Sequence, residues 1–159
     1  MRFKLLLILA LGVPAASAQE PQLSSDAPQD KLTHIAPGTN AQFEAAIAPY
    51  VAQAKQTYPS AKSKFQAGLA AGHSFFVTTR LYDGSAAFEQ VFIAVHDIDD
   101  GIISGKIWSD ISQVKGYKHG DNYSFSEDQI LDWLITNPDG TEDGNFVGKF
   151  LDTYTGSGT

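Results

Sequence analysis

The amino-acid sequence predicts an α+β domain in which N-terminal helices pack on an antiparallel sheet of five to six strands, flat or curled. Apolar residues recur at helical spacing before Gly72, whereas aromatic and β-branched residues dominate after it. The predicted strands are separated by tight Asp-Gly turns, which join antiparallel neighbours and cannot join parallel ones. The length of 159 residues, with 43% hydrophobic and 18% charged residues, fits one globular domain.

The helices are predicted between residues 39 and 72. Residues 39–42 fit a capping box, and apolar side chains then recur at helical spacing over residues 43–58. Pro49 is expected either to kink this helix or to begin a second one, and Pro59 is expected to end it. Apolar residues on one face over residues 61–69 predict a further helix.

The second part of the chain alternates short apolar runs with turn sequences. The turns lie at residues 83–84, 99–101 and 137–140, where Asp, Asn and Gly favour a reversal of the backbone. Strands are predicted over residues 75–82, 88–95, 102–108, 123–125, 130–135 and 145–151. Helices first and strands afterwards favour an antiparallel sheet with one face covered by the helices.

The two ends of the chain are predicted to lie outside this domain. Residues 1–18 have the three parts of a secretory signal peptide: two basic residues, a short apolar run and a small-residue cleavage pattern ending at Ala18. Residues 19–38 read as a flexible tether, residues 39–154 as the α+β domain, and residues 155–159 as a disordered tail. Cleavage near Ala18 predicts a periplasmic or secreted protein with no membrane span in its mature form.

The charge balance limits the classes of partner. The chain has 18 acidic and 11 basic residues and a net charge of −7. Removal of Arg2 and Lys4 with the signal peptide leaves 9 basic residues against 18 acidic ones, a net charge of −9. An acidic chain does not bind nucleic acid through a basic surface, but it suits a basic protein partner. The absence of cysteine excludes disulfides and thiolate metal sites.

No motif in the sequence predicts a catalytic residue, a metal site or a cofactor. Residues 96–101 place three carboxylates close together, but their spacing does not fit a calcium loop of the helix-loop-helix type, and a hairpin turn explains them. The four histidines form no pair with ligand spacing. Serine-nucleophile motifs and phosphate-binding glycine loops are missing as well.

Several segments, in order, resemble one bacterial family. The matching segments are residues 52–59, Phe75–Thr78, Glu89–Ile93, Gly105, Gly116–Asp121, Ile130–Trp133 and Asn145–Phe150. Together they make residues 44–153 resemble the YegJ-like family, catalogued as domain of unknown function 2314. The sequence departs from the family pattern at Gln90, where histidine is usual, and at Phe92, where tryptophan is usual. The resemblance implies the fold and export from the cytoplasm, but it implies no activity.

Glu89, Asp132 and Trp133 keep the family pattern and are the candidate binding residues. Two interpretations stay open for them. In the first, the two carboxylates lie on one exposed face of the sheet and form an acidic contact patch. In the second, Trp133 fills the core and Asp132 accepts hydrogen bonds from a neighbouring turn.

Three functions are compatible with the sequence. The first is a non-enzymatic, exported protein-binding domain, such as an immunity-type protein that neutralises a toxin. The second is an envelope hydrolase with a dispersed carboxylate site. The third is a small-molecule or lipid carrier whose sheet curls around an aromatic pocket. Charge reversal, carboxylate substitution and mass spectrometry of the purified protein distinguish these three.

Overall fold

The computed structural model describes residues 40–85 and 88–154. The predicted signal peptide (1–18), tether (19–38) and tail (155–159) lie outside the described residues. The described chain forms two α-helices, a short 3-10 helix and one six-stranded sheet. The elements are α1 (Asn40–Gln66), β1 (Ser74–Tyr82), β2 (Phe88–Asp99), β3 (Ile102–Ile107), β4 (Asn122–Ser126), η1 (Glu127–Gln129), β5 (Asp132–Thr136), β6 (Glu142–Gly144) and α2 (Phe146–Thr153).

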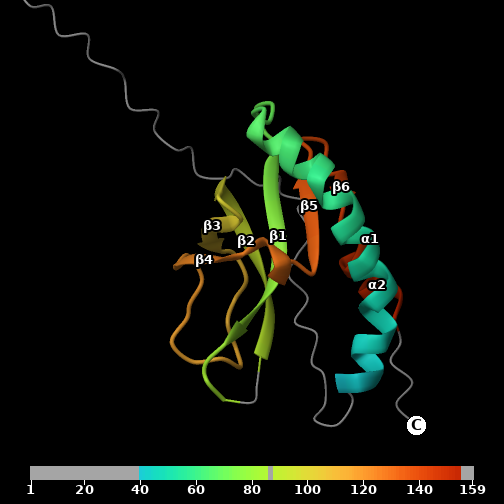
Figure 1. Cartoon of the computed structure of the whole chain (residues 1–159), viewed down its shortest axis with the longest axis vertical. Coiled ribbons are helices and arrows are strands. Elements are labelled where there is room, and N and C mark those ends of the chain that lie inside the picture. The colour runs from blue at the N-terminus through green and yellow to red at the C-terminus, as the bar shows by residue number, and fades with distance from the viewer. Residues whose placement is uncertain (1–39, 86–87, 155–159) are drawn as a thin grey trace, which may run out of the picture.

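The sheet is antiparallel throughout and open, which confirms the predicted α+β class. Its strand order is β4-β3-β2-β1-β5-β6, so that β4 and β6 are its edges. Figure 1 shows α1 and α2 together on one side of the molecule, with β4 near the other side. The pairing of β2 with β3 shifts register between Val95 and Asp97, where a bulge bends the long strand β2.

Helix α1 runs without a break through both prolines, so the predicted end of the helix at Pro59 is wrong, and so is the alternative in which a second helix begins at Pro49. A proline inside a helix costs about 3 kcal/mol, because it removes a hydrogen bond and clashes with the preceding turn. Both prolines lie on the exposed side of α1. The opposite side is buried along its whole length, through Phe43, Ile47, Ala54, Tyr58 and Ala61. The burial of this continuous face outweighs the cost of the prolines.

The sheet buries side chains on both of its faces. The face toward α1, here called the helix face, carries the main core, which includes Val77, Ile93, Ile103, Ile107 and Phe125. The opposite face carries a smaller apolar cluster made of Phe76, Ala94 and Leu134, with Phe92 and Trp108 packed against it. Helix α2 packs on α1 through a third cluster, in which the rings of Tyr50 and Phe150 stack with their centroids 4.4 Å apart.

The last predicted strand, residues 145–151, is wrong, because this segment forms helix α2. Phe146 and Phe150 are four residues apart, and so are Val147 and Leu151, which is also the spacing of a helix face. A short apolar run with this spacing does not distinguish the two structures. Asn145 adopts a left-handed conformation (φ 57°), which ends the extended backbone just before the helix begins.

Candidate functional site

Asp132, the first residue of β5, holds the N-terminus of helix α2. Its side chain is 1% exposed. One carboxylate oxygen, Oδ1, accepts the backbone N–H of Trp133 at 2.8 Å, and the other, Oδ2, accepts that of Val147 at 2.6 Å. The backbone N–H groups of Phe146 and Gly148 also donate to this carboxylate. The first N–H groups of a helix have no partner within the helix, so Asp132 caps α2 from a neighbouring strand.

Burial raises the pKa of Asp132 to about 6, although the four backbone N–H groups favour the charged form. The carboxyl group has almost no contact with water, and the cost of removing a charge from water outweighs these hydrogen bonds. The positive end of the helix dipole also favours the charged form of this carboxyl group. Asp132 is thus a buried structural acceptor.

Trp133 joins the sheet to α1. Its side chain is 6% exposed and lies in the main core. The indole Nε1–H donates to the carbonyl oxygen of Ala54 at 3.1 Å and to Oγ1 of Thr57 at 3.0 Å. The ring meets that of Phe146 edge-on, with centroids 5.9 Å apart. A buried tryptophan requires a partner for its N–H, and here the partner is the helix that covers the sheet.

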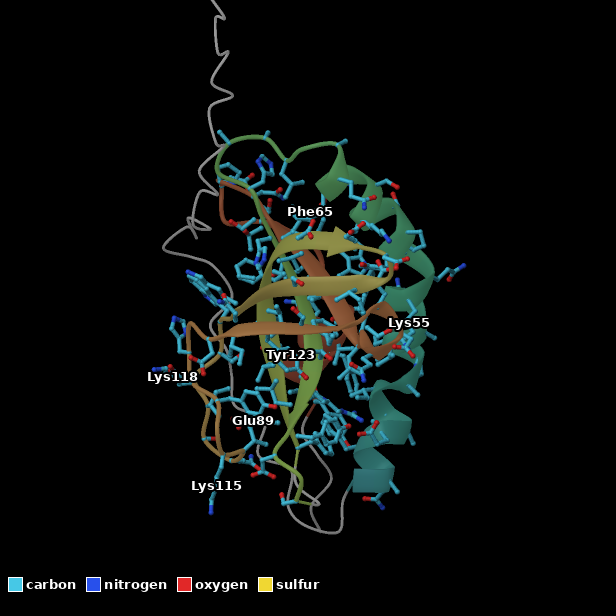
Figure 2. The ribbon with its side chains drawn as sticks, turned by 60° about the vertical axis from the view of Figure 1, so that its left-hand side comes forward. Lys55, Phe65, Glu89, Lys115, Lys118 and Tyr123 are labelled. Atoms are coloured by element: carbon cyan, nitrogen blue, oxygen red, sulfur yellow. The ribbon has the colours of Figure 1, made fainter. Side chains whose placement is uncertain are left out.

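Glu89, in β2, holds the long loop between β3 and β4 (Figure 2). Its side chain is 5% exposed. The carboxylate accepts the backbone N–H groups of Ser112, Gln113 and Val114 at 2.9 to 3.2 Å and the Ser112 hydroxyl at 3.0 Å. Burial alone would raise the pKa of Glu89, but the hydrogen bonds lower it below its usual value. Glu89 therefore serves as a charged anchor for this loop.

The two candidate carboxylates do not form one site. Glu89 pairs with Leu81 across β1 and β2, whereas Asp132 pairs with Thr78 across β1 and β5. Leu81 and Thr78 are three residues apart in β1, and successive side chains of a strand point to opposite faces. The interpretation that Glu89 and Asp132 form an exposed acidic patch on one face is therefore wrong: both are buried, on opposite faces. A binding role for Glu89, Asp132 and Trp133 stays a prediction.

A charged network that the sequence analysis missed lies between α1 and η1. The Tyr58 hydroxyl donates to Oε1 of Glu127 at 2.7 Å, and Nζ of Lys62 lies 2.7 Å from the same oxygen. Nζ of Lys55 donates to the carbonyl oxygen of Asp128 at 2.9 Å (Lys55 is labelled in Figure 2). These side chains, with Pro59 and Ile130, line a cavity of about 390 Å³. Burial, followed by the Glu127 carboxylate, raises the pKa of Tyr58, which keeps its hydroxyl a donor.

The sequence indicates the α1 residues of this network but not their partner in η1. Lys55, Tyr58 and Lys62 are three to four residues apart and so share one side of α1. Glu127 lies 69 residues after Tyr58, and no local pattern brings the two together. Burial alone would raise the pKa of Glu127, but Lys62 and Tyr58 lower it, so the carboxylate is charged and already satisfied. The network joins helix α1 to η1, the short helix that follows β4.

The part of the chain that the structure describes contains no group of three or more His, Asp or Glu side chains placed to hold a metal ion. The acidic segment singled out in the sequence, residues 96–101, forms the end of β2 and its turn into β3. Asp100 and Gly101 both have positive φ there, of 45° and 76°. Asp and Gly are favoured in this turn because they tolerate the left-handed conformation.

One family model matches this chain. Its description is "Uncharacterized protein conserved in bacteria (DUF2314)", and it matches residues 44–156, which is more than half of the chain. The chain belongs to this family. No curated protein and no solved structure matches the DUF2314 chain. The narrower YegJ-like label stays a prediction.

Two of the motifs that suggested the DUF2314 family have clear structural reasons. Gly105, in β3, has no room for a side chain, because a Cβ there would overlap the carbonyl oxygen of Ala94 and lie 2.6 Å from a methyl group of Ile93. In the segment Gly116–Asp121, both glycines have positive φ, and Asp121 accepts the backbone N–H of Lys118 at 3.0 Å. In this chain these residues allow the close packing of β3 against β2 and shape the loop before β4.

The two departures from the family pattern, Gln90 and Phe92, lie on the face of the sheet opposite α1. Gln90 pairs with Arg80, and Phe92 pairs with Thr78. Phe92 packs against the apolar cluster of that face, and its backbone N–H donates to the hydroxyl of Ser109 at 2.8 Å. The face that differs from the family pattern is thus separate from the one that holds Glu89.

No helix within the described residues is long and apolar enough to cross a bilayer.

Proposed function

We propose that this DUF2314 protein is an exported, non-enzymatic protein-binding domain that captures a basic partner, as an immunity-type protein does. The observation that carries the proposal is an apolar side chain set among carboxylates. Ile102 is 44% exposed and is one of two large apolar side chains in the described residues that are so accessible. It pairs directly with Asp99 across the turn between β2 and β3. Asp97, Asp99 and Asp100 are all exposed.

The surroundings of Ile102 suit contact with another protein. Ile102 also pairs with Ser126 of β4, and the backbone N–H of Glu127 donates to the carbonyl oxygen of Gly101 at 2.9 Å. This bond brings η1, with the exposed carboxylate of Asp128, beside the turn. We call Asp97, Asp99, Asp100, Ile102 and Asp128 the acidic end of the sheet. An apolar anchor inside a polar rim is the usual arrangement of a protein-binding hot spot. The negative charge of the acidic end of the sheet would speed association with a basic partner.

Export is supported by the sequence of residues 1–18, which has the three parts of a signal peptide. The hydrolase alternative gains no support from Glu89 and Asp132, because a catalytic carboxylate pair must reach one substrate bond. These two lie on opposite faces and use their oxygens on backbone N–H groups. The carrier alternative predicted a sheet curled around a pocket, and the sheet here is open.

The test is capture of a partner from envelope extract by the tagged mature protein at physiological salt. We expect a specific basic protein, and we expect Asp99→Lys to weaken its affinity by about tenfold, since a reversed charge beside a hot spot costs about 1–2 kcal/mol. Asp110→Lys is the matched control, because Asp110 is also exposed but lies beyond the opposite end of β3. Equal binding by both variants would contradict the proposed surface, and capture of no specific protein would contradict the proposed function.

A further inference from the structure

The two edges of the sheet differ in how they are protected. At one edge, β6 has only three residues, and its Glu142 and Asp143 are paired with Lys149 and Lys64. Short length and charge are the usual means by which an edge avoids pairing with another chain. At the other edge, β4 has five residues with the sequence Asn-Tyr-Ser-Phe-Ser, without a charge or a proline. No strand in the described residues pairs with its outer side.

The register shows which backbone groups of β4 point outward. Glu127 N–H bonds to Gly101 O, and Ile107 N–H bonds to Asp121 O, so the hydrogen-bonded pairs with β3 fall at odd-numbered residues of the strand. Ser104 and Ser124 form a non-hydrogen-bonded pair, in which side chains lie closest, and their hydroxyl oxygens are indeed 2.8 Å apart. The N–H and C=O groups of Asn122, Ser124 and Ser126 therefore point away from β3.

We infer that β4 pairs with β4 of a second copy of this chain, antiparallel and across a two-fold axis at Ser124. In this arrangement Ser124 faces its own counterpart, and Asn122 faces Ser126 of the second copy. The outward groups of these three residues then form about six backbone hydrogen bonds between the copies. A two-fold interface is self-complementary, and it extends the two sheets into one.

The side chains of β4 fit this register. Tyr123 is placed directly opposite Phe125 of the second copy, at a non-hydrogen-bonded position where aromatic pairs stabilise a sheet. Within one chain the two rings already stack, with centroids 5.7 Å apart, so the pairing continues an aromatic row on the helix face. On the opposite face, Ser124 meets Ser124, and both side chains are small and exposed.

The exposed charged side chains near the two ends of β4 have opposite signs. At the N-terminal end of the strand, the exposed Lys118 lies on the preceding loop (Figure 2). At the C-terminal end, η1 carries the exposed Asp128, while Glu127 is already paired with Lys62. Antiparallel pairing places Asp128 of one copy toward Lys118 of the other, while Asp121 and Glu127, which face each other at the ends of this register, already have partners in their own chain. A parallel arrangement would place like charges together.

The first experiment uses the absence of cysteine from the chain. Ser124→Cys introduces a single thiol at the two-fold axis, where the facing Cα atoms are about 5.5 Å apart, within the range of a disulfide. We expect this variant to form a disulfide-linked dimer rapidly under mild oxidation. Ser60→Cys, on the exposed side of α1, is the matched control and should stay monomeric over the same time. Equal rates of cross-linking by the two variants would overturn the inference.

The second experiment removes the central hydrogen bonds. Ser124→Pro deletes an N–H that points outward, so pairing with β3 is kept; proline is tolerated at such edge positions. An edge contact of this size predicts a dissociation constant in the micromolar range, about 10–100 µM. In sedimentation velocity at about 200 µM we expect dimers for the unmodified protein and for Ser124→Ala, and monomers for Ser124→Pro with an unchanged circular dichroism spectrum. Monomers of the unmodified protein, or dimers of Ser124→Pro, would overturn the inference, as would failure of Ser124→Cys to cross-link faster than its control.

Discussion

Glu89 and Asp132 are two buried carboxylates that use the same kind of partner with opposite electrostatic results. Each accepts three or more backbone N–H groups of a segment distant in sequence. Asp132 is 1% exposed, and burial raises its pKa to about 6. Glu89 is buried too, but its N–H donors together with the Ser112 hydroxyl overcome the cost of burial and lower its pKa.

The difference shows that each carboxylate is adapted to the segment it holds. Asp132 caps a helix whose first N–H groups need an acceptor at every pH. A carboxyl group that is partly neutral near pH 6 can still accept hydrogen bonds from them. Glu89 organises a loop with no regular structure of its own, and the loop depends on a full negative charge. The contacts of both residues assign them a structural role in this chain.

The largest effect is expected from removing the acceptor of helix α2. Asp132→Ala leaves the N–H groups of Trp133 and Val147 buried without a partner, which costs about 3–4 kcal/mol of the free energy of unfolding. Asp132→Asn keeps one oxygen acceptor and should cost less than half as much. Urea denaturation at pH 7 measures both. A loss below about 1 kcal/mol for Asp132→Ala would show that α2 does not depend on this cap.

The pH dependence of stability separates the two carboxylates. The pKa of Asp132 is raised from 3.8 to about 6 by folding, so the folded state binds the additional proton between these values. The free energy of unfolding should therefore fall by about 3 kcal/mol as the pH rises from 4 to 6. The pKa of Glu89 is lowered from 4.5, so its contribution is present above pH 4.5 and is lost as the pH falls below it.

Chemical denaturation from pH 3 to pH 7 tests this pair of opposite slopes. Asp132→Asn should remove the decrease in the free energy of unfolding between pH 4 and 6, and it should leave the loss of stability below pH 4.5 unchanged. Glu89→Gln should keep that decrease and should reduce the loss of stability below pH 4.5. If Asp132→Asn retains the full decrease, another group titrates in this range, and the assignment to Asp132 is wrong.

A smaller effect is expected from neutralising Glu89. Glu89→Gln keeps one oxygen acceptor and loses the charge that strengthens the bonds from Ser112, Gln113 and Val114, which costs about 2 kcal/mol. Hydrogen exchange should become faster at these three amides and stay unchanged at Val147, which bonds to Asp132. Glu44→Gln, a partly exposed carboxylate on α1, is the matched control. Uniformly faster exchange would indicate global destabilisation rather than release of the loop.

The sequence predicted the sheet better than the helices and the site. Strands β1 to β5 follow from short aromatic or β-branched runs, most of them bounded by Gly-containing turns, because both signals are local. The continuity of α1 through Pro49 and Pro59 and the helical state of α2 were missed, because burial against other elements decides both. For the same reason the sequence could not tell that Glu89 accepts N–H groups 23 to 25 residues away and that Asp132 accepts one 15 residues away.

A smaller effect again is expected at Trp133, the neighbour of Asp132, which joins the same strand to the other helix. Trp133→Phe keeps most of the buried ring and loses the indole N–H that donates to Ala54 O and Thr57 Oγ1. Both oxygens keep other partners, since the Thr57 hydroxyl donates to the carbonyl oxygens of Gln53 at 2.9 Å and of Ala54 at 3.2 Å. We therefore expect a loss of about 1–2 kcal/mol, less than for either carboxylate. Thr57→Val, which removes only the hydroxyl, should cost less still, about 0.5 kcal/mol or below, because Thr57 is only partly buried. A larger loss for Thr57→Val than for Trp133→Phe, measured by thermal denaturation, would show that the hydroxyl, and not the indole, is the main link between β5 and α1.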